Sequence, residues 1–139
     1  MKKVIVAMFC VAAAGWAQDH AEFHAAMKAT GTAFEALQKM EPKTGQAAVS
    51  AAESLGAVYE RMIGFWRQEH LADAVKISVD GKAAATQLAS AAYAGNNQQA
   101  AVAFKALGAT CRACHTKYRV KRPDGSTTFA PLYLERKRQ

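Results

Sequence analysis

Apolar side chains recur at every third or fourth position along most of the chain, the spacing that places them on one face of an α-helix. Alanine is abundant, and the runs of Val, Ile and Thr that favour strands are nearly absent. The pattern predicts four helices, over about residues 19–40, 46–66, 72–94 and 97–118. Four amphipathic segments of this length, joined by short connections, predict an all-α fold, an antiparallel four-helix bundle.

Each predicted helix has an apolar stripe that should face the core. The expected members are Phe23, Met27, Thr30, Phe34 and Leu37 in the first helix; Ala48, Ala52, Leu55, Val58 or Tyr59, Met62 and Phe65 or Trp66 in the second; Val75, Val79, Leu88, Ala92 and Tyr93 in the third; and Ala101, Phe104, Leu107 or Gly108, Cys111, His115 and Tyr118 in the fourth.

Turn-forming and capping residues predict where the helices begin and end. Asp19 is expected to cap the first helix, and Pro42 to help end it. Asp80-Gly81 weakens the third helix near its middle and would allow a break there. Gly95 suits a left-handed cap after the third helix, and Asn97 is expected to cap the start of the fourth.

The N-terminal segment has the pattern of an export signal. Lys2 and Lys3 precede a short apolar run, and Gly15 and Ala17 supply the two small residues of a cleavage site. We therefore expect residues 1–17 to be a signal peptide and the mature protein to be periplasmic. A membrane anchor is the alternative, but the run is shorter than the ~20 residues that span a bilayer. We expect no stable membrane insertion after cleavage.

The main chemical motif is Cys111-Arg112-Ala113-Cys114-His115, a C-x-x-C-H sequence typical of covalent haem attachment. The two thiols lie about one helical turn apart on one face, so each can add to one haem vinyl group, and His115 can bind the iron. A redox dithiol would want a βαβ context. A zinc site would need further ligands, for which the chain offers only His20, His24 and His70. We predict one covalent haem c, with its iron.

The motif stands near the C-terminus, after three predicted helices, and in this the chain resembles the class II c-type cytochromes, the cytochrome c' family. The resemblance covers about residues 19–122. It rests on the sequence 111–119, the Phe65-Trp66 pair, Asp73-Ala74-Val75 and the pattern Met27-x3-Gly31-x2-Phe34. It implies a left-handed antiparallel four-helix bundle over residues 18–122, with the haem near one end. Members of the family often pair through their first two helices, which implies a homodimer.

The resemblance also implies which residue faces the open side of the iron. Many members have an apolar residue there and bind small gases at a five-coordinate iron, whereas a low-spin branch has a Met ligand. Aligning Phe34 with the first-helix Phe of the family puts Met27 at that position. Ordinary core packing is the alternative for Met27, and His24 is an alternative ligand. Phe34 would line the pocket, and Arg119 would lie near the haem, neutralising a propionate or tuning His115; a plain surface charge is its alternative.

Basic residues gather at the C-terminal end. Residues 112–139 contain 8 Lys or Arg against 2 Asp or Glu, whereas residues 18–111 contain 8 against 9. Export, and the lack of interleaved stacking aromatics, argue against nucleic acid. Residues 122–126 predict a turn, and residues 123–139 are expected to form an irregular basic tail. This end would steer an acidic redox partner protein toward the haem, with a simply solvated tail as the alternative.

Together these features give a functional hypothesis. The protein would be a periplasmic carrier of single electrons, not an enzyme, with its haem iron ligated by His115 and Met27. The alternative is a five-coordinate cytochrome c' that binds small gases such as nitric oxide or carbon monoxide. A dithiol protein without haem is a third hypothesis.

Overall fold

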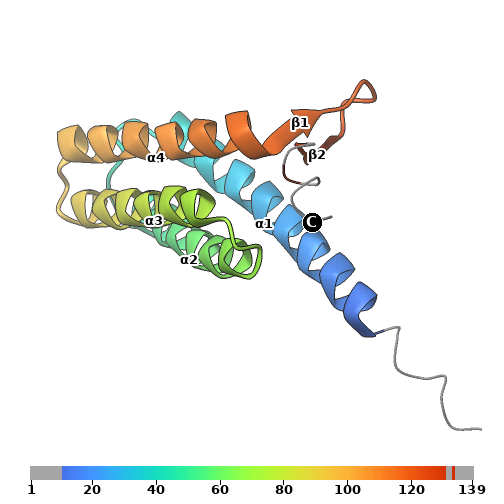
Figure 1. Cartoon of the computed structure of the whole chain (residues 1–139). Coiled ribbons are helices and arrows are strands. Elements are labelled where there is room, and N and C mark those ends of the chain that lie inside the picture. Colours follow the sequence, from blue (N-terminus) through green and yellow to red (C-terminus); the bar gives the residue numbers. More distant parts are fainter. Residues whose placement is uncertain (1–10, 131–132, 134–139) are drawn as a thin grey trace, which may run out of the picture.

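The computed structural model describes residues 11–130 and Tyr133. Its elements, in chain order, are α1 (Val11–Lys39), α2 (Gln46–Gln68), α3 (Ala72–Tyr93), α4 (Asn97–Tyr118), β1 (Arg119–Lys121) and β2 (Thr127–Phe129). The two strands form an antiparallel hairpin that follows α4 directly (Figure 1). The expected signal sequence lies outside the described residues up to residue 10, and residues 11–17 form the start of α1.

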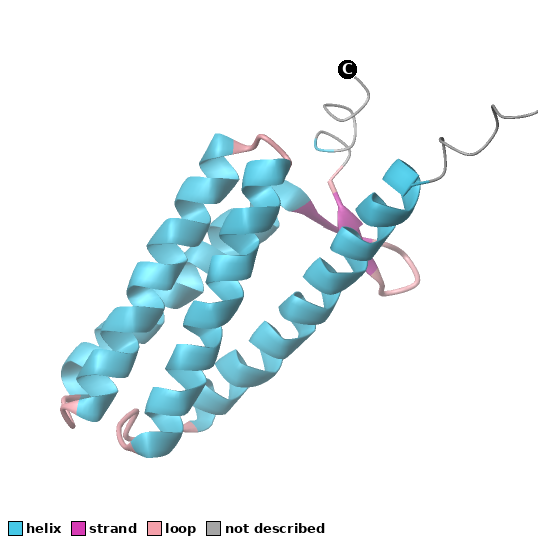
Figure 2. Cartoon of the chain, turned by 90° about the horizontal axis from the view of Figure 1, so that it is seen from below, coloured by secondary structure: helices cyan, strands magenta, loops and turns pink. Residues whose placement is uncertain are grey.

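The helices form the predicted four-helix bundle. Helix α3 packs between α2 and α4, and α1 packs against α2. Helices α1 and α4 meet at one end of the bundle, where the rings of Phe34 and Phe104 stack with centroids 4.5 Å apart. From there α1 diverges from the other helices toward the hairpin (Figure 2). In the described part of the chain, none of the helices combines the length and the apolar character that crossing a membrane requires.

The core confirms the predicted stripes of the first two helices but corrects the third. Val79 and Tyr93 are 44% and 84% exposed, and Leu88 alone among the large predicted residues of α3 is fully buried. The buried face of α3 consists mostly of small residues: Ala74, Ser78, Gly81, Ala84, Ala85, Ala91 and Ala92. Small side chains let α3 approach α2 closely, and of its larger residues Val79 and Tyr93 are exposed. In α4, Ala101 is likewise exposed, and its neighbour Ala100 is buried instead.

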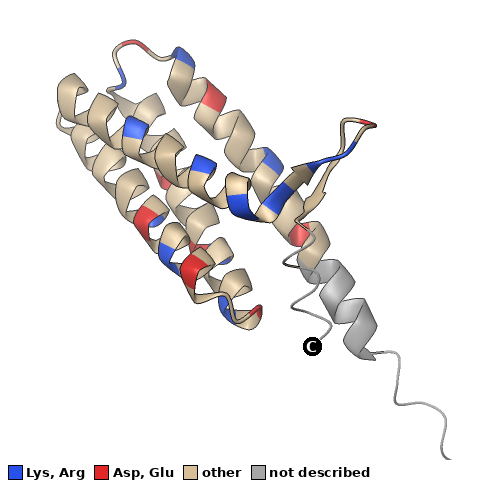
Figure 3. Ribbon diagram, turned by 45° about the horizontal axis from the view of Figure 1, so that its top comes forward, with Lys and Arg blue, Asp and Glu red and all other residues tan. Residues whose placement is uncertain are grey.

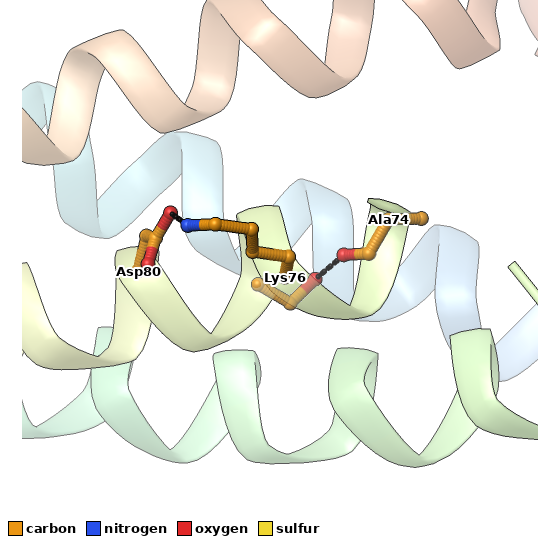
Figure 4. A network of polar contacts seen from close by, with 4 residues as sticks. Ala74, Lys76 and Asp80 are labelled. Atoms are coloured by element: carbon orange, nitrogen blue, oxygen red, sulfur yellow. Dashed lines mark hydrogen bonds and ion pairs between the residues drawn. The ribbon is translucent and has the colours of Figure 1, made fainter. Parts of the chain in front are cut away.

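Helix α3 continues through Asp80-Gly81, so the break that this pair would allow does not occur. The Asp80 carboxylate forms an ion pair with Lys76, one turn earlier, at 2.6 Å (Figure 4). This spacing of four residues fits a continuous helix. Gly81 packs against α2: a Cβ built at this position would lie 2.2 Å from Cε1 of Tyr59. The glycine therefore serves the contact between two helices rather than a break.

Two predicted helix caps are also wrong. Helix α1 begins at Val11, so Asp19 lies inside the helix and does not cap it. Asn96, not Asn97, caps α4, because its side chain accepts a hydrogen bond from the backbone N–H of Gln99 at 3.1 Å. The Asn97 side chain instead binds the loop after α1, where it accepts from the N–H of Lys43 at 2.8 Å. Gly95 has the expected left-handed conformation, with φ of 68°.

The C-terminal tail is more ordered than predicted. The turn over residues 122–126 is confirmed: the N–H of Arg122 donates to the carbonyl of Ser126, and the Asp124 carboxylate accepts from the N–H of Ser126. Residues 127–129 then pair with β1 as a strand, with Phe129 opposite Arg119. The sequence does not predict β2 because three residues are too few to show an alternation of apolar and polar positions, and the strand depends on the burial of Phe129. Residues 131–132 and 134–139 lie outside the described part.

Candidate haem-binding site

A cavity of about 400 Å³ lies where α1 diverges from α4. All four helices and the hairpin contribute to its wall. The lining residues are Phe23, His24, Met27, Thr30, Gly31 and Phe34 from α1; Tyr59, Met62 and Trp66 from α2; Ile77 and Ser78 from α3; Gly108, Thr110, Cys111, Arg112, Cys114, His115 and Tyr118 from α4; and Arg119, Thr127, Thr128 and Phe129 from the hairpin.

The structure brings every residue predicted for the site into this one lining. Cys111, Cys114 and His115 come from the last two turns of α4, because their spacing keeps them on one helical face. Met27 and Phe34 come from α1, two turns apart on the face that looks toward the bundle. The sequence could not show that these two faces lie opposite each other.

The first cysteine belongs to a chain of hydrogen bonds. The Thr110 hydroxyl donates to the carbonyl of Leu107 at 2.7 Å, so its oxygen is left to accept. The Tyr59 hydroxyl lies 2.8 Å from the Thr110 oxygen and 3.4 Å from the Cys111 sulfur. With the Thr110 proton committed, Tyr59 donates to Thr110 and the Cys111 thiol donates to Tyr59. Burial raises the pKa of Tyr59 well above its usual range, so the hydroxyl remains a donor.

The second cysteine and the histidine sit in less polar surroundings. Burial, with a smaller contribution from the nearby Cys111, raises the pKa of the Cys114 thiol to about 11, so it stays protonated at neutral pH. Both thiols are free. Burial lowers the pKa of His115, and the positive charge of Arg119 lowers it further. His115 is therefore neutral at neutral pH, the form in which imidazole binds a metal.

The lining also fits the haem group itself. Most of the wall is apolar, as a porphyrin face requires, and the guanidinium groups of Arg112 and Arg119 contribute positive charge. The indole Nε1 of Trp66 is buried in the wall and has no hydrogen-bond partner among the residues that the structure describes. An unpaired buried donor is costly, and a propionate carboxylate of a bound haem is an acceptor of the right kind for it.

Comparison with known proteins identifies the family. A family model described as Cytochrome C' matches residues 65–119. A cytochrome c' from Pararhodospirillum photometricum is 38% identical over 103 residues, which are 74% of this chain and 70% of that relative. The chain belongs to the cytochrome c' family. No solved structure gives a significant match.

As a cytochrome c', the chain carries one covalently attached haem c with its iron, and its bundle follows the up-down-up-down topology known for this family. The family-model match contains the whole haem-attachment motif and Trp66. It excludes Met27 and Phe34, which precede it, and β2, which follows it. The family-model match therefore supports the haem-attachment residues on α4. It does not cover the residues of α1 that line the cavity.

Several lining residues were not singled out as site residues from the sequence. Tyr59 was assigned only to the core stripe of the second helix, and Thr110, Ser78 and Arg112 had no signal of their own. Phe129 follows a predicted turn within a tail expected to be irregular. Its aromatic character close to the motif was the one signal that could have suggested a role. His24 also lines the cavity, from an exposed position on α1, and remains the alternative to Met27 as a ligand of the iron.

Proposed function

We propose that the protein is an exported mono-haem cytochrome c' that binds small gases such as nitric oxide or carbon monoxide without catalysing a reaction itself. The observation that carries this proposal is the haem-attachment motif in the wall of a largely apolar cavity, in a chain of the cytochrome c' family. The sequence hypothesis put electron transfer first. Family membership favours gas binding instead, because a five-coordinate iron is the usual state in this family.

In this proposal the residues of the cavity have distinct tasks. Cys111 and Cys114 would hold the haem through two thioether bonds, and neutral His115 would bind its iron. When bound, the haem supplies an iron that can exchange one electron and take a small ligand. Arg119 and Trp66 offer a positive charge and an N–H donor to the propionates. Phe34 and Met27 keep the α1 side apolar, which excludes water from the site.

A second candidate function is single-electron transfer with Met27 as the sixth ligand. It is favoured by one specific observation, the thioether side chain of Met27 in the α1 wall of the cavity. Thioether ligation tends to raise the reduction potential of haem iron. A six-coordinate iron also changes little in geometry between its two oxidation states, which suits electron transfer.

Optical spectra of the purified protein separate the two functions. If the iron is five-coordinate, the reduced protein lacks sharp α and β bands, takes up carbon monoxide readily, and is almost unchanged by Met27→Ala. If Met27 is a ligand, the oxidised protein shows a weak near-infrared sulfur-to-iron band that disappears in Met27→Ala. Met40→Ala is the matched control, because Met40 is also partly buried but lies outside the cavity lining.

Covalent attachment and export are tested by mass. Mature protein made with the cytochrome maturation machinery should begin at Gln18 and carry the added mass of one haem. Replacing both Cys111 and Cys114 by Ser should leave haem that acid-acetone extracts. Protein without haem would support the dithiol hypothesis. Light scattering would test the homodimer that the family resemblance implies, with α1 and α2 as the proposed contact.

A further inference from the structure

The C-terminal hairpin forms one side of the cavity. Thr127, Thr128 and Phe129 line it together with the haem-attachment motif. The family match ends at Arg119, the first residue of the hairpin, so Thr127, Thr128 and Phe129 lie outside the matched residues. The hairpin leaves the end of α4 and reaches back to the first half of α1 (Figures 1 and 2).

Phe129 connects the hairpin to two helices. Its side chain is only 8% exposed. Its ring centroid lies 4.9 Å from that of His20 and 5.6 Å from that of Phe23, both on α1, and 6.0 Å from that of Phe65 on α2. Phe129 thus fills the space between α1 and α2 just where α1 has diverged from α4.

Two polar contacts hold the residues that follow Phe129. The N–H of Ala130 donates to the carbonyl of Tyr118, at the end of α4, at 3.0 Å. Tyr133 is 2% exposed, and its hydroxyl donates to the carboxylate of Glu69 near the end of α2. Burial and the Glu69 contact raise the pKa of Tyr133 above its usual range, so this donor persists. The hairpin segment is therefore fixed to α1, α2 and α4 at once.

We propose that Phe129 is a size filter of the haem pocket: by holding the first half of α1 against the hairpin, it admits diatomic ligands to the iron and excludes bulkier ones. This proposal rests on haem occupying the cavity, but not on whether Met27 binds the iron. A bulky ligand needs α1 and the hairpin to separate, which breaks the aromatic contacts of Phe129. A diatomic ligand needs no such opening.

The test compares the association rates of carbon monoxide and n-butyl isocyanide with the reduced haem protein. Phe129→Ala removes the aromatic contacts that oppose this separation, so it should raise the isocyanide rate by about tenfold or more, while the carbon monoxide rate changes little. Phe129→Leu, which keeps an apolar side chain, serves if the alanine variant does not mature, and should show a smaller rise of the same kind.

Two controls distinguish a filter from general loosening. Leu37→Ala removes a fully buried side chain from α1 outside the cavity lining, and Val120→Ala shortens an exposed residue of β1. Neither should change the ratio of the two rates. Hydrogen exchange gives a second readout: amides of residues 20–27 should exchange faster in Phe129→Ala than in Leu37→Ala. Equal rises in both rates, or an unchanged isocyanide rate, would overturn the proposal.

The result can be separated from the proposed function. The spectrum of the wild type first shows whether Met27 binds the iron. If it does, both rates are measured in a Met27→Ala background, where the iron is open in every variant. The proposal on Phe129 then stands or fails by the rate ratio alone, whatever the outcome for gas binding by the native protein.

Discussion

Gly81 shows how the haem site depends on a residue outside its lining. The ring of Tyr59 occupies the space in which a Cβ of residue 81 would stand, and the same ring carries the hydroxyl that contacts Thr110 and Cys111. A methyl group at Gly81 must displace the ring. The side chain that joins α2 to the attachment segment of α4 thus requires a glycine on α3.

Gly81→Ala should consequently destabilise the protein by about 1–3 kcal/mol, the usual range for overpacking. Urea unfolding measures this loss. Gly56→Ala is the matched control, since its Cβ would lie 3.9 Å from that of Ala85, an ordinary contact. Alanine is also the better helix former by up to about 1 kcal/mol, so this control should be neutral or stabilising. Equal stability of the two variants would contradict the assigned role of Gly81.

Asp73 gives a residue-scale prediction about pH. Its carboxylate pairs with Lys117 and accepts the Tyr118 hydroxyl at 2.7 Å, and these contacts lower the pKa of Asp73 to about 2. The carboxyl group of an Asp in an unfolded chain has a pKa of about 3.9. The folded state therefore resists protonation, and the stabilisation is present above about pH 4 and is lost as the pH falls toward about 2.

Asp73→Asn should lower the free energy of unfolding at pH 7 and converge with the wild type near pH 2. The effect should be modest, because both members of the ion pair are about half exposed and exposed pairs contribute little. Denaturant unfolding across this pH range measures it. Asp80→Asn, which removes an exposed pair within α3 alone, is the control. The hypothesis fails if Asp73→Asn keeps the full wild-type slope between pH 4 and 2.

At the scale of elements, the sequence predicted what local chemistry determines. Helices α2, α3 and α4 begin and end within two residues of the predicted bounds, because Gly, Pro and Asn mark the turns. The predicted inward face of α3 is wrong because alanines and Gly81, rather than Val79 and Tyr93, make the close contact. The hairpin was missed because its three-residue strands depend on burial of Phe129, a tertiary effect.

Asn96, the residue before α4, offers an element-scale test. Asn96→Ala removes the side chain that accepts from the N–H of Gln99, so we expect a loss of about 1 kcal/mol, typical for an N-cap. Thermal unfolding measures the loss, and faster hydrogen exchange in the first turn of α4 should accompany it. Gln98→Ala, on the exposed side of the same turn, should change neither. No effect of Asn96→Ala would contradict the assigned cap.

At the scale of the whole molecule, positive charge gathers at the cavity end. Exposed basic residues run along the last turns of α4 and through β1 into the turn (Figure 3): Arg112, Lys117, Arg119, Lys121 and Arg122. Two of them, Arg112 and Arg119, also line the cavity. An acidic redox protein that docked there would meet the pocket that is proposed to hold the haem.

Electrostatic attraction between these basic residues and an acidic partner weakens as the salt concentration rises. Reduction of the haem protein by an acidic flavodoxin should slow as ionic strength rises, and the double variant Lys121→Glu/Arg122→Glu should be slower at low salt. Lys39→Glu, at the end of α1 far from the cavity, should leave the rate unchanged. Stopped-flow absorbance measures all three. Rates that do not depend on salt would remove the basis for an acidic partner.

Residue spacing alone predicts the candidate site on one side only, because the predictions of Met27 and Phe34 on α1 rest on the family resemblance. The spacing of Cys111, Cys114 and His115 within one helix determines their common face, so the attachment side followed from the motif. The distances between α1, α2 and the hairpin depend on side-chain packing, which a single sequence does not show. For that reason the contacts of Tyr59, the unpaired N–H of Trp66 and the position of Phe129 emerged only from the structure.

The placement of Trp66 has a practical consequence. The chain contains two tryptophans, and Trp16 falls within the segment that cleavage after Ala17 would remove. Trp66 would then be the sole indole fluorophore of the mature protein, held in the wall of the pocket. A porphyrin beside it would quench its emission by energy transfer. The native protein should be nearly dark and brighten on denaturation, so its unfolding can be followed without an added dye.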